Sequence, residues 1–154
     1  MIGEVLWAQS NLPSVLQSYR ASLSIGEHLV KTAPDNSYWR GELAMSQSRI
    51  GSVLSDQGNL AEALQSHRAA LNTTEYLVKA YPTNSIWQRA LALHHGEVGK
   101  LLARQGAQSE ATAAFKQGHA IIAGLMQQFP DDPTLSKDSC LVRGAACGSG
   151  EVIS

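Results

Sequence analysis

The chain repeats itself with a period of about 48 residues, and this repetition constrains the fold more than any other feature of the sequence. The first third of the chain aligns with the second third, and a weaker third copy runs from Val98 to Pro130. Identical pairs include Ile2 and Ile50, Gly3 and Gly51, Leu16 and Leu64, Arg20 and Arg68, Pro34 and Pro82, and Trp39 and Trp87. Repetition at such a period is typical of proteins that stack copies of one supersecondary unit.

Each copy has the hydrophobic pattern of two helices. Spacings of four and three residues connect its apolar positions, as on one face of an α-helix, and no long stretch alternates with period two as a strand would. In the second copy these positions are Leu60, Leu64, His67, Leu71, Thr74, Val78 and Tyr81, followed by Trp87, Leu91, His94, Val98 and Leu101. Gly58 favours a left-handed helix end, Pro82 ends the preceding helix, and Asn84 or Ser85 caps the next one. We predict helices over 1–9, 12–32, 37–57, 60–80, 85–105 and 108–128, and a further helix that begins at Pro133.

The order of small and large residues in each copy resembles that of tetratricopeptide repeats. That family pairs a glycine in the first helix with a small residue twelve positions later, a large residue after four more and a small residue after three more. The matching sets are Gly51, Ala63, His67 and Ala70; Gly99, Ala111, Phe115 and Gly118; and Gly3, Val15, Tyr19 and Ser22. Val15 departs from the pattern, because a small residue is expected there. We expect Gly51 and Gly99 to let helix backbones approach closely.

The repeat is longer than the usual 34 residues of that family. The excess is about seven residues per helix, close to two full turns, so a lengthened helix keeps the same face toward its neighbour. In this respect the chain is similar to arrays found in bacterial multi-domain signalling proteins.

The resemblance implies an all-α fold, a right-handed superhelical solenoid of antiparallel helix pairs. The solenoid would cover 1–143, with a half repeat at 1–33, repeats at 34–81 and 82–129, a partial capping helix at 130–143 and a flexible tail at 144–154. Because the pattern starts in the middle of a repeat, two interpretations stay open. The chain is either a remnant or sensor part of a larger multi-domain signalling protein, or its open ends pair in a homo-oligomer.

The composition excludes several classes of partner. Lys and Arg number 12 and Asp and Glu number 13, which leaves a net charge of -1. Nucleic-acid binders and polybasic membrane-surface proteins need a basic surface, so neither class is expected. The longest apolar run, Ala120 to Met126, is far shorter than the roughly 20 residues of a membrane span, and the N-terminus has no secretory signal. We predict a cytoplasmic protein.

No pattern in the sequence indicates catalysis, a metal or a cofactor. His94 and His95 are adjacent and so do not face each other on a helix, and Cys140 and Cys147 lack a second cysteine pair. Nucleophile-elbow, phosphate-loop and dinucleotide-binding motifs are absent from the sequence. We therefore expect no enzyme, no cofactor and no metal; the remaining alternative is an enzyme that uses His94, His95 and Glu97.

The resemblance implies that the first helices of the pairs line a concave groove that binds a peptide or helix of a partner protein. The implied groove residues are Glu4, Trp7, Ser48, Ser52, Ser55, Asp56, Lys100 and Arg104. Lys100 and Arg104 stand one turn apart and would present two cations to an acidic peptide; the alternative is a solvated face steadied by Glu97. Trp7 has Ser55 as its repeat partner, so it is either a binding hot spot or part of an exposed end. The implied function is that of a protein–protein interaction scaffold.

Overall fold

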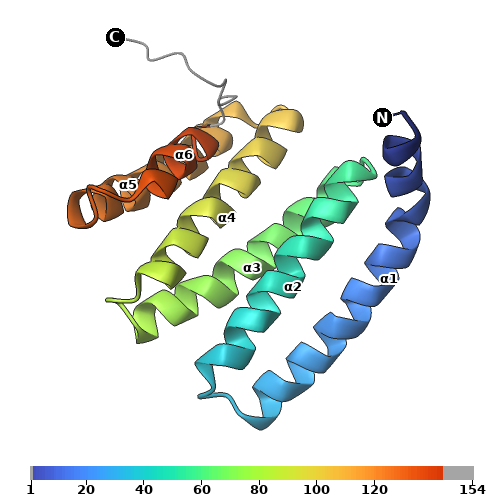
Figure 1. Ribbon diagram of the computed structural model, residues 1–154, viewed down its shortest axis with the longest axis horizontal. Coiled ribbons are helices and arrows are strands. Elements are labelled where there is room, and N and C mark those ends of the chain that lie inside the picture. Colours follow the sequence, from blue (N-terminus) through green and yellow to red (C-terminus); the bar gives the residue numbers. More distant parts are fainter. Residues whose placement is uncertain (1, 144–154) are drawn as a thin grey trace. The chain divides into compact units, whose positions relative to one another are not determined.

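The computed structural model of the chain describes residues 2–143, with side chains from Asn11 onward. Over this range the fold is all-helical, with six helices, and within each half of the chain consecutive helices pack against each other (Figure 1). The chain divides into two compact units, Met1–Ala80 and Tyr81–Ser154, and each has its own buried core. The tail predicted at 144–154 lies outside the described residues.

The first unit consists of α1 (Ile2–Thr32), α2 (Ser37–Asp56) and α3 (Leu60–Ala80). Helix α2 packs against both of the others, so its buried face carries much of this core. Short turns join the three helices, and consecutive helices therefore run in opposite directions (Figure 1). The buried side chains of α2 are Leu43, Ala44, Ile50, Val53 and Leu54.

Helix α1 is continuous where the sequence pattern predicts two helices, 1–9 and 12–32, and that prediction is wrong. The later copies have Gly58 and Gly106 at the corresponding turn, with φ of 83° and 85°. Ser10 stands in their place, and a residue with a Cβ is disfavoured in this left-handed conformation. The first copy therefore lacks the residue that ends the helix, and Pro13 lies inside α1.

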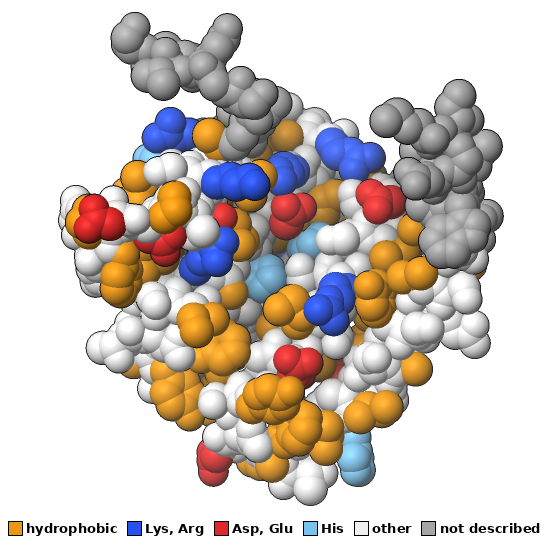
Figure 2. All heavy atoms as spheres, viewed as in Figure 1, with side chains coloured by type: hydrophobic (Ala, Val, Ile, Leu, Met, Phe, Trp, Pro, Cys, Tyr) orange, Lys and Arg blue, Asp and Glu red, His pale blue; other side chains and the backbone are white. Residues whose placement is uncertain are grey.

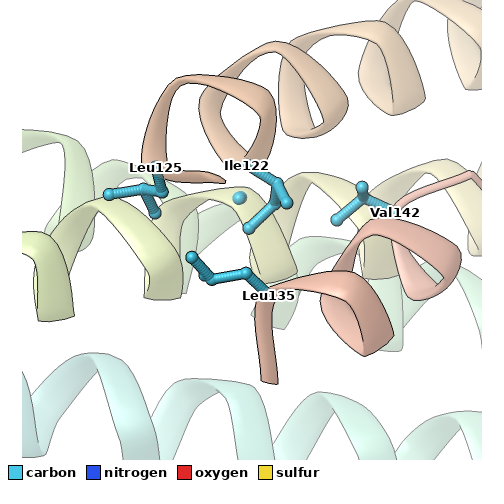
Figure 3. Packing of buried hydrophobic residues seen from close by; sticks show 5 residues of the cluster. Ile122, Leu125, Leu135 and Val142 are labelled. Atoms are coloured by element: carbon cyan, nitrogen blue, oxygen red, sulfur yellow. The ribbon is translucent and has the colours of Figure 1, made fainter. Parts of the chain in front are cut away.

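The second unit consists of α4 (Ser85–Arg104), α5 (Gln108–Gln128) and the short α6 (Pro133–Leu141). Helices α4 and α5 form an antiparallel pair, and α6 contacts both of them. Their shared core is a cluster of Ala92, Ile122, Leu125, Leu135 and Val142, four of which are drawn with labels in Figure 3. Helix α6 thus closes one side of this core with Leu135 and, just past its end, with Val142.

Most helix boundaries agree with the sequence pattern. The predictions of 60–80 and 108–128 are confirmed, those of 37–57 and 85–105 are one residue too long, and a helix does begin at Pro133. The caps explain this agreement, because the Asn84 side chain accepts hydrogen bonds from the backbone N–H groups of Ile86 (3.0 Å) and Trp87 (3.3 Å). Asn36 accepts the equivalent bond from Trp39 at 3.2 Å.

The buried face of α3 is displaced from the predicted one at two positions. Leu71 and Val78 are only half-buried, whereas Ala70 and Leu77 are fully buried. The small Ala70 allows α3 to lie close to α2, and the larger Leu71 flanks this contact instead of filling it. In α4 the predicted face is confirmed from Leu91 to Leu101.

The two repeat glycines make room for rings. A Cβ built on Gly51 would lie 2.6 Å from Cδ2 of His67, and one on Gly99 would lie 2.7 Å from Cε1 of Phe115. The sequence predicts that the backbone of the facing helix approaches these glycines. The atoms nearest to them belong instead to side chains of that helix. Close backbone approach does occur at Gly118, where a Cβ would lie 2.9 Å from the carbonyl oxygen of Ala92.

Candidate partner-binding site

The predicted groove residues of the first unit form a polar strip on α2. Ser52 and Asp56 are exposed, and Ser48 and Ser55 are half-buried along the same helix face. The hydroxyl of Ser52 donates a hydrogen bond to the carbonyl oxygen of Ser48 at 3.2 Å. The side chains of Glu4 and Trp7 lie outside the described residues, so their predicted roles stay predictions.

The predicted groove residues of the second unit lie near the C-terminal end of α4. Lys100 Nζ donates to Glu97 Oε1 at 2.9 Å, and both side chains are about 40% exposed (39% and 41%). Such an exposed ion pair contributes at most about 1 kcal/mol, so Lys100 can exchange this partner for another carboxylate at little cost. Arg104 is exposed in the last turn of α4. Lys100 and Arg104 thus stand one turn apart on α4, and Glu97 pairs with Lys100.

The histidines named in the enzyme alternative are packed inside the second unit. His94 and His95 are both buried in α4. Among the side chains from Asn11 to Arg143, no three His, Cys, Asp or Glu residues gather as a metal site would require.

Charges of both signs share the surface. Figure 2 shows Lys and Arg side chains interspersed with Asp and Glu side chains on the face drawn, with hydrophobic side chains between them. None of the described helices is long and apolar enough to cross a membrane.

A further site, which the sequence did not predict, lies wholly within the second unit. A cavity of about 470 Å³ opens between the first half of α4, the end of α5 and the start of α6. We call it the α4–α6 cavity; its lining residues are Ser85, Ile86, Arg89, Ala90, Leu93, Leu125, Phe129, Asp132 and Leu135. Its volume falls within the range of about 300–1,000 Å³ that is common for ligand pockets.

The walls of the α4–α6 cavity are mostly apolar. Leu125 and Leu135 are buried members of the core cluster, and they connect the cavity to the packed interior. Ile86 and Phe129, in contrast, are 70% and 47% exposed. Two large apolar side chains that line the cavity thus keep much of their surface in water.

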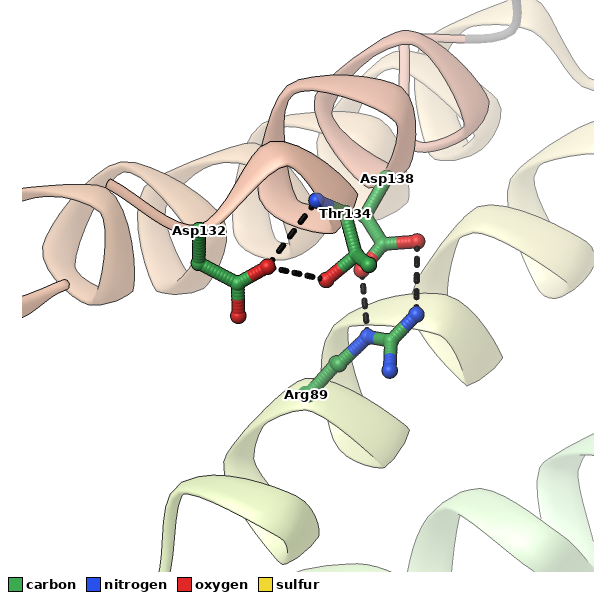
Figure 4. Close-up of polar contacts among 4 residues, drawn as sticks. All are labelled: Arg89, Asp132, Thr134 and Asp138. Atoms are coloured by element: carbon green, nitrogen blue, oxygen red, sulfur yellow. Dashed lines mark hydrogen bonds and ion pairs between the residues drawn. The ribbon is translucent and has the colours of Figure 1, made fainter. Parts of the chain in front are cut away.

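The polar residues beside the cavity hold α6 in place (Figure 4). Arg89 Nε donates to Asp138 Oδ2 and Arg89 Nη2 donates to Asp138 Oδ1 at 3.2 Å, so the guanidinium binds both carboxylate oxygens. Asp138 is only 3% exposed, and this hydrogen-bonded pairing raises the pKa of Arg89. The pair therefore ties α6 to α4.

Asp132 caps the N-terminus of α6 at the rim of the cavity. Its Oδ1 accepts hydrogen bonds from the backbone N–H of Thr134 at 2.9 Å and from the Thr134 hydroxyl at 2.6 Å (Figure 4). These bonds lower the pKa of Asp132, which is therefore a carboxylate at neutral pH. The rim thus carries a negative charge next to apolar walls.

The sequence does contain one indication of this site, namely large apolar residues that recur with the repeat period. Phe129 precedes the proline of its copy as Tyr81 does, and Ile86 precedes the repeat tryptophan as Tyr38 does. All four of these large side chains are exposed. An apolar residue that recurs with the period but does not enter the core is a candidate for binding.

Comparisons of the chain with protein-family models, with characterised proteins and with solved structures find no match.

Proposed function

We propose that the chain is a protein–protein interaction module, a tetratricopeptide-like array that holds a segment of a partner protein. In this proposal the helix pairs stack into a right-handed superhelical solenoid, and their first helices line its concave groove.

The observation that carries the proposal is the equivalent packing of two helix pairs. In the α2–α3 pair the ring of His67 fills the space at Gly51, and in the α4–α5 pair the ring of Phe115 fills the space at Gly99. Ala63 and Ala111 are buried at the matching position of each pair. Arrays are built from such equivalent pairs, each of which contacts only its neighbours.

The exposed polar strips support the location of the groove. Ser52 on α2 and Arg104 on α4 belong to the first helices of their pairs, and both side chains are open to solvent. Lys100 adds a second cation whose ion pair with Glu97 is weak enough to be exchanged. We propose that an acidic segment of the partner binds there.

Site-specific photo-crosslinking in cells that produce the chain tests this function. A photoreactive phenylalanine analogue replaces Ser52 on the proposed groove and, in a separate control, the exposed Asn72 on α3. We expect a defined protein adduct at position 52 that is absent at position 72. The adduct should weaken when Lys100→Glu is combined with Arg104→Glu.

The matched control for charge is Lys31→Glu combined with Lys79→Glu, two exposed lysines in the last turns of α1 and α3. This pair should leave the adduct unchanged. Equal adducts at positions 52 and 72, or equal effects of the two double variants, would contradict a groove on the first helices.

A further inference from the structure

We propose that the α4–α6 cavity binds a peptide segment in which a large apolar side chain lies next to a lysine or arginine. The inference rests on the proposed function, because it gives the interaction module a second docking surface and names the chemistry of its occupant. This surface lies at the start of α4, whereas Lys100 and Arg104 lie at the other end of that helix.

The apolar part of the occupant follows from the cavity walls. Ile86 and Phe129 leave much of their surface in water although both line a cavity whose other walls include Leu93, Leu125 and Leu135. An apolar side chain in this space would remove both of them from water, which is the main favourable contribution in protein association. Exposed large apolar residues recur at Tyr38 and Tyr81, the repeat equivalents of Ile86 and Phe129.

The cationic part of the occupant follows from the charges at the rim. Arg89 has both oxygens of Asp138 as partners and a smaller electrostatic attraction to Asp132, so its charge is already compensated. Asp132 uses only Oδ1 for Thr134, and its other oxygen accepts no hydrogen bond from the described residues. Asp131 is exposed beside it. The rim therefore has an excess of negative charge, and a basic side chain next to the apolar one would complement it.

The open rim favours a peptide as the source of this chemistry. Pockets for small molecules enclose about 70–90% of the ligand surface. With Ile86 at 70% exposure and Phe129 at 47%, an occupant of the α4–α6 cavity stays accessible along one side. The open side leaves room for the peptide backbone that carries the apolar side chain bound in the cavity. The cavity walls that α4 and α6 provide are in place before binding, because the Arg89–Asp138 pair and the buried Leu135 hold α6 against α4.

The test uses the full chain and three labelled hexapeptides. The first has the sequence Gly-Lys-Phe-Leu-Lys-Gly, the second has glutamate in place of both lysines, and the third has alanine in place of phenylalanine and leucine. Fluorescence anisotropy at low ionic strength gives their affinities, and amide chemical shifts of the labelled protein locate the peptide. We expect the first peptide to bind most tightly, with the largest shifts at Ala90, Leu93 and Leu135.

Two matched pairs of variants then separate the apolar and the ionic contributions. Ile86→Ala should weaken the first peptide roughly tenfold, while Ile25→Ala, at an isoleucine of α1 with a similar exposure (62% against 70%), should not change its affinity. Asp132→Asn should weaken it up to about fivefold, and more than Asp131→Asn does. Asparagine is as good an N-cap as aspartate, so α6 keeps its start in this variant.

Tighter binding of the glutamate peptide, an undiminished affinity in Ile86→Ala, or no binding of the first peptide at millimolar concentration would each overturn the cavity proposal. Shifts confined to Ser52, Lys100 and Arg104 would overturn it too, and they would support the groove of the proposed function. A failure of the crosslinking test with intact cavity binding would instead remove the groove and leave the cavity.

Discussion

At the residue scale, glycine-to-alanine variants at the repeat positions should differ in free energy of unfolding, because the added Cβ meets different neighbours at each glycine. In Gly51→Ala the new Cβ meets the His67 ring, which is fully buried. Overpacking of this kind costs about 1–3 kcal/mol, and the better helix propensity of alanine returns up to about 1 kcal/mol. We therefore expect a net loss of free energy of unfolding for Gly51→Ala in urea denaturation.

Gly99→Ala should lose less, because the ring of Phe115 is partly exposed and can shift toward solvent. Gly124→Ala is the matched control, since a Cβ there meets nothing within 4 Å in the same kind of helix interior. It should raise the free energy of unfolding by about 0.5–1 kcal/mol. If Gly51→Ala were as stable as Gly124→Ala, this result would contradict the close contact between the His67 ring and Gly51 in the α2–α3 pair.

At the element scale, the attachment of α6 depends on one ion pair. Arg89→Ala leaves the Asp138 carboxylate buried without the guanidinium that binds both of its oxygens. A buried acceptor that loses its partner costs about 1–3 kcal/mol, so α6 should detach more often. Amide hydrogen exchange of Cys140 and of Val142, whose N–H donates to the carbonyl oxygen of Asp138, should become faster, while that of α3 should not change.

Two variants control for side effects of removing arginine. Arg49→Ala, at an exposed position of α2, should leave the free energy of unfolding almost unchanged. Arg89→Ala combined with Asp138→Ala should lose less than Arg89→Ala alone, because no carboxylate is then stranded. A double variant as unstable as the single one would mean that the arginine acts through its packing alone.

Acid should weaken the start of the same helix. The hydrogen bonds from Thr134 lower the pKa of Asp132 below its ordinary value of 3.8. A carboxyl group with a lower pKa in the folded state adds stability above its ordinary pKa, and this stability is lost as the pH falls through the lowered value. The cap is therefore complete at neutral pH and fails only as the pH falls through this lowered pKa, which lies below 3.8.

An NMR titration of the Asp132 carboxyl carbon, with amide exchange of Thr134 followed over the same range, measures this loss. Asp132→Asn should keep the cap and make it independent of pH, because the amide oxygen accepts the same bonds without titrating. A midpoint at or above 3.8 in the unmodified chain would contradict the proposed capping geometry.

The sequence predicted elements better than it predicted contacts, for a physical reason. Caps and helix ends are local, so Gly58, Asn84 and Pro133 identified boundaries from neighbouring residues alone. The continuity of α1 was missed because the repeat alignment imposed a turn that only a glycine would have supported. The Arg89–Asp138 pair joins residues 49 positions apart, and no periodic pattern connects them.

Repetition can single out Ile86 and Phe129, but the α4–α6 cavity itself was missed for the same reason as the ion pair. Its walls come from three helices, and the space appears only once α6 has packed on α4 and α5. The predicted groove residues, in contrast, follow one helix face each, which periodicity can identify.

At the scale of the whole molecule, the two compact units predict that the chain can be divided without loss of helix. Residues 81–154 contain a complete core, because Leu135 and Val142 cover Ala92, Ile122 and Leu125 of the α4–α5 pair. Domains of about 55–65 residues commonly fold alone, so this fragment is large enough. We expect it to be helical by circular dichroism and to unfold cooperatively in urea.

The decisive comparison is with residues 81–130, which keep α4 and α5 but lack α6. Without Leu135 and Val142 the core cluster opens to solvent, and the Arg89 guanidinium loses its carboxylate. Removing two buried apolar side chains of this size costs about 2–5 kcal/mol each in well-packed cores, which is comparable to the whole stability of a small domain. The shorter fragment should therefore unfold over a broad range of urea concentration, with weak helical signal. A cooperative transition at the same midpoint in both fragments would show that α6 does not close the core, and the α4–α6 cavity would then lose the wall that α6 provides.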